Sequence, residues 1–381
     1  MRDTTFDWDS HIASGPHRAL PAMAYASEDL TQQEETAIFR THWFSVGRAD
    51  LVARPGDYIA LDVAGQAILL LRDRKGVLRA FANACRHRGA RLAEGAGRTT
   101  NLRCPFHSWM FQLSGELAAA PHMEEAAGFD RDAYSLIAYR AEERFGIAFI
   151  CLNPDAPALD AQLGNFGALH GDWPLDQLKS LRRREMVVGC NWKAFLDVFN
   201  EYYHLPFVHP DSIDDIYQRP DAGDEATGAF ASQFGGTDGT GGLLQTEQDK
   251  ALPSMPGLKG RALHGVRYSW AFPNMSFAAS SDAMWMYEAY PMGPDHCHVV
   301  QTASFPPETL GAVGAEEKLA AYLARLDAAI DEDIPALENQ HRGLKCTDAR
   351  PGQLHPLLEA NVAGFARWYA TEMNRAHAAP T

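Results

Sequence analysis

The chain has 381 residues, 46% of them hydrophobic and 22% charged, a composition typical of a globular protein with room for two domains. Its formal net charge of −15 at pH 7 argues against nucleic acid or an anionic membrane as a partner, because both require a positive surface. No apolar run reaches the roughly 18 residues of a membrane-spanning helix.

The N-terminal sequence MRDTTFDWDSHIASG lacks the basic start and apolar run of a secretory signal. Six scattered cysteines form no disulfide framework, so the expected location is the reducing cytoplasm. Residues 1–40 are expected to form a helical segment that packs on the larger domain. Its main helix is predicted from Ser27, a capping residue, to Thr41.

Residues 41–155 have the pattern of a small all-β domain. Short alternating or β-branched runs are separated there by Gly, Asp, Asn and Pro. The runs expected to be strands are GDYIALDVAG, QAILLLRDRKG, VLRAFANAC, SWMFQLSGEL and FGIAFICLNPDAP.

Residues 156–381 have a mixed pattern, which makes the expected fold class α+β. The strand-like stretch RRREMVVGCNW precedes a helical segment, KAFLDVFNEYYH, and residues 221–260 read as a long Gly-rich loop. An antiparallel sheet is expected from VRYSWAFPN, MSFAASS, AMWMYEAYPM and CHVVQTASFP. Flanking helices are expected over residues 315–344 and about 356–374.

The first candidate metal site combines Cys85 and His87 with Cys104 and His107, so that each of two loops offers one thiolate and one imidazole. A [2Fe–2S] cluster with two Cys on one iron and two His on the other requires this mixed set. A zinc site also accepts Cys and His, but its ligands are usually paired as Cys-x2-Cys or His-x3–5-His. The spacing favours the iron–sulfur cluster.

The region from Glu34 to Pro121 resembles the Rieske domain of the ring-hydroxylating oxygenase family, in the stretches HWFSVGRADL, PGDY, NACRHRGARL and CPFHSWMFQLSGEL. The resemblance implies a Rieske domain over residues 41–155 and a helix-grip-like catalytic domain over residues 156–381. One departure is Ser108, where the family usually has Gly. This position is not an expected ligand.

The second candidate metal site is the segment EYYHLPFVH, which contains Glu201, His204 and His209. Non-haem Fe(II) oxygenases bind iron through two His and one carboxylate, with positions left open for O2 and substrate. Glu201 and His204 would share a helix face. Because Pro206 is unfavourable in a helix interior, we expect His204 near the helix end and His209 in the following turn. In isolation, two histidines and an acid more often form a buried cluster whose hydrogen bonds are satisfied within the protein. The Cys/His cluster motif on the same chain makes an iron site the favoured interpretation.

Residues 190–209 also resemble the family's iron-binding segment, in which Asn-Trp-Lys precedes Glu-x-x-His-x4-His. The family often has Asn at the position of Val198, so a hydrogen bond found in relatives is expected to be absent here. The resemblance implies that Glu201 is an electron-transfer bridge between His204 and a cluster histidine, His107 of the partner subunit, in a head-to-tail homotrimer. An additional iron ligand and a surface acid remain the other interpretations of Glu201.

The third iron ligand is expected on the helix predicted over residues 315–344. At about 100° per residue, Asp333 lies within roughly 40° of the apolar stripe, whereas Asp331 and Glu332 lie well off it. The alternative is that Asp333 caps a helix that restarts at Pro335. The stripe is formed by Leu319, Leu323, Leu326, Ile330 and Leu337.

The resemblance implies a terminal oxygenase that receives electrons from a separate flavin- or ferredoxin-type NAD(P)H reductase. The cluster passes them to Fe(II), which activates O2 to hydroxylate or demethylate a small organic substrate. No Gly-x-Gly-x-x-Gly follows a strand, so the flavin and nicotinamide sites are expected on another polypeptide. The alternatives are a Rieske electron carrier without oxygenase activity and a zinc-stabilised binding module.

The substrate pocket is expected between the strand at Met284–Tyr290 and the loop at 221–260. Alternation places Trp285 and Tyr287 on one strand face, where they could stack on an aromatic ring or contribute to a cage for a quaternary ammonium. Packing within the sheet core explains them equally well. The ending His-Arg-Gly-Leu resembles the branch that acts on methylammonium compounds and small aromatic acids, and monohydroxylation, demethylation and dihydroxylation all stay open.

Overall fold

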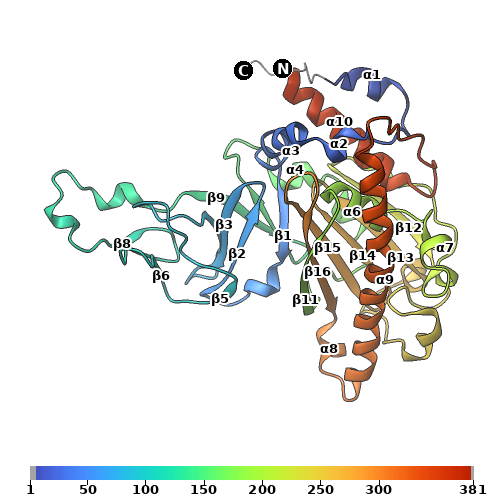
Figure 1. Ribbon diagram of the computed structural model, residues 1–381. Helices are drawn as coiled ribbons and strands as arrows, with labels where there is room; N and C mark the ends of the chain where they lie inside the picture. Colours follow the sequence, from blue (N-terminus) through green and yellow to red (C-terminus); the bar gives the residue numbers. More distant parts are fainter. Residues whose placement is uncertain (1–5, 379–381) are drawn as a thin grey trace. The chain divides into compact units, whose positions relative to one another are not determined.

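The computed structural model describes residues 6–378, so the first five residues of the expected N-terminal segment lie outside it. The chain forms two compact units. One comprises Phe39–Ala156, and the other combines Met1–Ile38 with Pro157–Thr381 (Figure 1). None of the helices formed by residues 6–378 has both the length and the apolar character needed to span a bilayer.

The smaller unit is all-β, as the sequence predicts. A seven-stranded antiparallel sheet has the order β1-β10-β9-β4-β3-β2-β5, and a second sheet has the order β6-β7-β8 (Figure 1). Its strands are β1 (Phe44–Arg48), β2 (Asp57–Val63), β3 (Gln66–Arg72), β4 (Leu78–Ala82), β5 (Ala96–Arg98), β6 (Leu102–Arg103), β7 (Met110–Phe111), β8 (Leu117–Ala119), β9 (Ala138–Arg144) and β10 (Ile147–Cys151). Short 3-10 turns occupy Ala49–Val52, Met123–Glu125 and Arg131–Tyr134.

The larger unit contains a six-stranded antiparallel sheet in the order β11-β16-β15-β14-β13-β12. The expected run of neighbouring antiparallel strands is therefore confirmed. The strands are β11 (Lys179–Val188), β12 (Phe230–Gly236), β13 (Gly265–Ala271), β14 (Met275–Ala279), β15 (Met284–Pro291) and β16 (Cys297–Phe305).

Strand β12 corrects the expectation of a long loop over residues 221–260. The strand pairs along its whole length with β13 at the edge of the sheet. A Cβ atom on Gly235 would lie 2.7 Å from the Tyr202 hydroxyl, and one on Gly236 would lie 2.5 Å from the Gln218 side chain. The glycines thus permit close packing within a strand, a use of Gly that composition alone does not distinguish from a loop.

Helices α6 (Trp192–Phe199) and α9 (Ala315–Leu344) carry the residues of interest. Helix α6 packs on β14, β15 and β16 and beside α9 (Figure 1). Helix α9 continues through Pro335, so it does not restart there. The other helices are α1 (Trp8–Ala13), α2 (Met23–Ala26), α3 (Glu28–Glu34), α4 (Leu159–Leu163), α5 (Phe166–Leu169), α7 (Leu205–Val208), α8 (Pro307–Leu310) and α10 (Ala360–Ala378), with 3-10 turns at Asp214–Ile216, Gln245–Lys250 and Gly260–His264.

The N-terminal segment joins the larger unit through a buried ion pair. Ser27 caps α3 as predicted, although this helix ends at Glu34 and continues as a π-turn, Glu35–Phe39. The Lys193 ammonium lies 2.6 Å from the Glu34 carboxylate, and neither side chain is exposed. Trp192 and Tyr369 also donate to Glu34, which satisfies the buried charge and connects α3, α6 and α10.

Candidate metal centres

The segment after α6 departs from the predicted helix. Asn191 caps the start of α6 by accepting from the Lys193 backbone amide, and the helix ends at Phe199. The Asn200 side-chain amide donates to the Leu196 carbonyl and to the Ser276 hydroxyl on β14. Glu201 and His204 therefore do not share a helix face as expected, because these contacts end the helix before them.

His204 and His209 flank a single short helix. His204 caps the start of α7, Pro206 occupies its first turn, and His209 follows its end. The first turn tolerates proline because its backbone amides need no partner inside the helix. The two imidazole centroids lie 5.0 Å apart, so one helical turn orients both rings towards one point.

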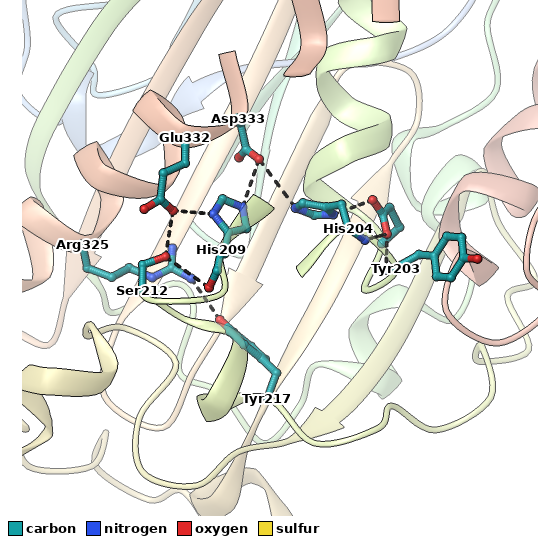
Figure 2. A network of polar contacts seen from close by, with 9 residues as sticks. Tyr203, His204, His209, Ser212, Tyr217, Arg325, Glu332 and Asp333 are labelled. Atoms are coloured by element: carbon teal, nitrogen blue, oxygen red, sulfur yellow. Dashed lines mark hydrogen bonds and ion pairs between the residues drawn. The ribbon is translucent and has the colours of Figure 1, made fainter. Parts of the chain in front are cut away.

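Asp333 on α9 completes this group of side chains (Figure 2). Its Oδ1 atom lies 3.0 Å from His209 Nε2 and 3.6 Å from His204 Nε2. The ligand atoms of the three residues all lie within 4.8 Å of one another. Asp333 Oδ1 is buried and receives no hydrogen bond from the described residues.

The outer nitrogens of both imidazoles face carboxylates. His204 Nδ1 lies 2.5 Å from Glu201 Oε1, and His209 Nδ1 lies 2.6 Å from Glu332 Oε2. A proton held at each Nδ1 leaves a lone pair on each Nε2. In that state the two Nε2 lone pairs and the Asp333 oxygen, which accepts no hydrogen bond, point towards one another with no hydrogen between them. Two imidazole nitrogens and one carboxylate oxygen are a donor set that a divalent metal such as Fe(II) binds.

The charge around the histidines also suits a cation. Burial by itself would lower the pKa of His204, but the Glu201 and Asp333 carboxylates raise it above its usual value. With both imidazoles neutral, the carboxylates of Glu201, Glu332 and Asp333 give the group a negative charge. A bound divalent cation would neutralise it.

Glu332 is a residue of this site that the sequence analysis missed. Its Oε2 atom accepts from the Ser212 hydroxyl at 2.7 Å as well as contacting His209 (Figure 2). Helical periodicity predicts Glu332 off the buried face of α9, and its side chain is indeed 37% exposed. The contact depends on where the loop after α7 places His209, and no sequence pattern signals that.

Glu201 lies on the side of His204 that faces away from Asp333. Its carboxylate accepts from the backbone amides of Tyr203 and His204 and contacts Nδ1 of the same histidine. The converging group of ligand atoms does not include it. Val198 lines the adjacent pocket and, being apolar, offers no hydrogen bond to either histidine.

A small pocket adjoins the converging ligand atoms, with a volume of about 40 Å³. That space holds about three water molecules, so any organic molecule that enters requires lining side chains to move. Tyr287 lines the pocket, whereas Trp285 and the described residues of 221–260 do not. The lining residues are Phe195, Val198, Phe199, Glu201, Tyr202, His204, Leu205, His209, Ile213, Tyr268, Tyr287, Arg325, Ala329, Ile330 and Asp333.

Two loops of matching backbone geometry carry the candidate cluster ligands in the smaller unit. The Cys85 amide donates to the Ala90 carbonyl, and the Cys104 amide donates to the Trp109 carbonyl, each at 2.8 Å. In each loop the fourth residue after the cysteine donates back to the cysteine carbonyl. Those two residues, Gly89 and Ser108, have φ values of 79° and 61°. Ser108 thus adopts a left-handed conformation that glycine adopts without strain.

The side chains of these loops place two thiols inside and two imidazoles further out. Cys85 and Cys104 are buried and within hydrogen-bonding distance of each other, and burial raises the pKa of Cys85. The rings of His87 and His107 lie 4.6 Å apart, and His87 stacks on Trp109. Two adjacent thiols and two adjacent imidazoles are the ligand set of a mixed Cys/His iron–sulfur cluster.

Comparisons with known proteins identify a family for each of the two domains. Residues 175–375 match the family described as ring hydroxylating alpha subunit (catalytic domain), and residues 42–133 match the Rieske [2Fe–2S] domain. The chain is 36% identical over 211 residues to the carnitine monooxygenase oxygenase subunit of Escherichia coli K12, which covers 54% of this chain and 56% of that relative. The chain thus spans only about half the length of this relative.

More distant matches extend over nearly the whole chain. The glycine betaine monooxygenase oxygenase subunit of Chromohalobacter salexigens is 25% identical over 98% of this chain and 89% of its own length. A solved quaternary ammonium Rieske monooxygenase superimposes with a TM-score of 0.79 and 26% identity, over 94% of this chain and 97% of that one. Naphthalene 1,2-dioxygenase from Rhodococcus sp. shares the fold, with a TM-score of 0.74 and 20% identity. The match covers 93% of this chain and 94% of that one.

Proposed function

This chain belongs to the family of ring-hydroxylating oxygenase alpha subunits, and from that premise we propose that it is the terminal oxygenase component of a multicomponent system. The two domains of this family imply a [2Fe–2S] cluster and a mononuclear Fe(II). The single observation that supports this best is the convergence of two imidazole nitrogens and a carboxylate oxygen within 4.8 Å beside a pocket. When bound, the two groups supply one-electron transfer and O2 activation.

His204, His209 and Asp333 are the proposed ligands of the mononuclear iron. Cys85, His87, Cys104 and His107 are the proposed ligands of the cluster. The chain's own contribution at the iron site is to fix the ligand atoms. Glu201 and Glu332 hold the Nδ1 protons, so that both Nε2 atoms stay available.

Glu201 is the proposed electron-transfer bridge. Its Oε1 atom contacts His204 Nδ1, the ring nitrogen opposite the one that approaches Asp333, and its Oε2 atom accepts from two backbone amides. In a head-to-tail homotrimer a cluster histidine, His107 of the partner subunit, would approach this carboxylate. A separate NAD(P)H reductase of the flavin or ferredoxin type would reduce the cluster.

The proposed substrate is a small quaternary ammonium compound or an aromatic acid, which is hydroxylated or demethylated. Relatives named for carnitine and glycine betaine support the first class. The pocket's aromatic wall, formed in part by Phe199, Tyr268 and Tyr287, suits either class.

The first experiment is metal and sulfide analysis of anaerobically purified protein. The proposal predicts acid-labile sulfide, a red-brown visible spectrum and more iron than the cluster alone contains. O2 uptake with NADH and a reductase should then depend on the added betaine or aromatic acid. A colourless protein that contains zinc and no sulfide would refute the oxygenase assignment, and uptake that no compound stimulates would favour an electron carrier.

A further inference from the structure

The pocket beside the proposed iron ligands contains a buried positive charge. Arg325 lies on α9, lines this pocket together with His209 and Asp333, and is only 2% exposed. An arginine side chain stays protonated at all physiological pH values. The site therefore has a fixed cation in its wall.

No carboxylate of the described residues lies within ion-pairing distance of Arg325. Two acids of its helix have other partners: Asp327 pairs with Arg182, and Glu332 contacts His209. Its polar partners are two tyrosine hydroxyls: Nη2 donates to Tyr217 at 3.0 Å (Figure 2), and the side chain also hydrogen-bonds to Tyr268. Its Nε is buried and has no acceptor in the structure. The tyrosine hydroxyls solvate the guanidinium but do not neutralise it, so an anionic ligand would supply the missing counter-charge.

Arg325 also occupies a face of Trp285, one of the two aromatic residues expected to contribute to an ammonium cage. Its guanidinium carbon lies 4.8 Å from the centroid of the Trp285 ring. A cation–π site already filled by an arginine repels a second cation. Trp285 is therefore not free to contribute to an ammonium cage.

A neighbouring tyrosine provides a second donor. The Tyr287 hydroxyl accepts from Gln301 Nε2 at 3.0 Å, and this leaves its own hydrogen for another acceptor. Among the residues that the structure describes, no acceptor for that hydrogen is found. Tyr287 lines the same pocket as Arg325.

We propose that Arg325 is the specificity-determining residue of this pocket and that it binds the carboxylate of an anionic or zwitterionic substrate. This inference rests on the proposed function and narrows it, because the carboxylate becomes the obligatory group and a quaternary ammonium becomes optional. Arginine donates two parallel hydrogen bonds to a carboxylate, a geometry that an uncharged or cationic ligand does not match. Helix α9 holds Arg325 and Asp333 eight residues apart, which separates their Cα atoms by about 12 Å.

The test measures binding and needs no turnover. Oxidised holoenzyme without a reductant is titrated by calorimetry with two matched pairs of probes: benzoate against benzamide, and glycine betaine against choline. Each pair differs mainly in the carboxylate. We expect both carboxylates to bind more tightly than their partners.

Variants then assign the preference to Arg325. We expect Arg325→Met to weaken binding of the carboxylates by about 10- to 150-fold, the usual effect of a hydrogen-bonded charge, and to leave choline and benzamide unchanged. Arg325→Lys, which keeps the charge, should retain part of the affinity. Tyr322→Phe, a buried change on the same helix outside the pocket lining, should change neither pair.

The wild-type comparison alone can overturn the proposal if Arg325→Met fails to fold. Choline that binds at least as tightly as glycine betaine, together with benzamide that binds at least as tightly as benzoate, would refute it. Unchanged carboxylate affinity in a folded Arg325→Met protein would refute it too. Because the experiment measures binding, it separates the two hypotheses. If the protein prefers carboxylates but lacks oxygenase activity, the role of Arg325 stands and the proposed function is wrong.

Discussion

Replacing Glu332 tests whether the carboxylate behind His209 controls metal binding. Glu332→Gln removes the charge but keeps an oxygen that can accept from His209 Nδ1 and from Ser212. Glu332→Ala removes both contacts, which measure 2.6 Å and 2.7 Å. Partners of this kind typically contribute 10- to 100-fold to metal affinity.

The exposure of Glu332 sets where in that range each variant should lie. Its side chain is 37% exposed, so water screens part of its charge. We therefore expect Glu332→Gln to weaken Fe(II) binding by about 10-fold, or ~1.4 kcal/mol. Glu332→Ala also frees the imidazole to rotate and to exchange its proton between nitrogens. The Fe(II) affinity of Glu332→Ala should therefore fall by about 100-fold.

The assay is an anaerobic Fe(II) titration of protein whose mononuclear site has been emptied, in competition with a chromogenic chelator. The cluster absorbance reports that each variant is folded. Asp331→Asn is the matched control, because Asp331 is the exposed neighbour of Glu332 on α9. Equal affinity for Fe(II) in Glu332→Ala and in the control would refute the proposed role of this carboxylate.

Three other changes test separate parts of the mechanism, and a fourth tests the effect of a buried acid of α6 on stability. Asp333→Ala should lose the mononuclear iron and keep the cluster spectrum, whereas Asp331→Ala should keep both; iron retained by the first variant would exclude its proposed ligand. Glu201→Gln should bind both metals but slow electron transfer at least about 10-fold, and unchanged single-turnover kinetics would remove the bridge. Cys85→Ala should be colourless, and a coloured protein would mean a different ligand set. Burial raises the pKa of Asp197 to about 7, so this group costs stability progressively as pH rises from about 4 to 7. Asp197→Asn should therefore raise the unfolding free energy at pH 8 by roughly 2–4 kcal/mol and by less at pH 5, as measured by urea unfolding.

The sequence was most informative where residue type and spacing were both constrained. Two Cys-x-His-like pairs are rare in other contexts, and the structure brings Cys85 and Cys104 into contact and the rings of His87 and His107 to 4.6 Å. The apolar stripe of α9 likewise placed Asp333 near the buried face, and its oxygen lies 3.0 Å from His209 Nε2. Periodicity suffices in such cases because a regular helix carries the side chain to its position.

The sequence was least informative where irregular backbone sets a side chain's direction. The helical pattern continued through His204, but two hydrogen bonds from Asn200 end α6 before it. The contact between Glu332 and His209 crosses 123 positions in the chain. The Gly-rich stretch that suggested a loop contains β12. In this strand, Gly235 leaves room for the Tyr202 side chain to pack closely. Each of these outcomes depends at least in part on a contact between residues far apart in the sequence, such as Asn200 with Ser276.

The role inferred for Arg325 explains why one helix carries so much of the site. Asp333 and Arg325 belong to the same continuous helix, whereas His204 and His209 belong to a loop and a short helical turn. A rigid helix fixes the distance between the proposed metal ligand and the proposed carboxylate anchor, so the loop can adjust around a substrate without changing that distance. Because the pocket holds only about 40 Å³ in this conformation, it must expand when a substrate binds. Leu205 and Ile213 belong to the part of the pocket wall that lies outside α9. Selectivity for the distance between the carboxylate and the oxidised carbon would then reside in the helix, and tolerance for the bulk of the substrate would reside in the loop.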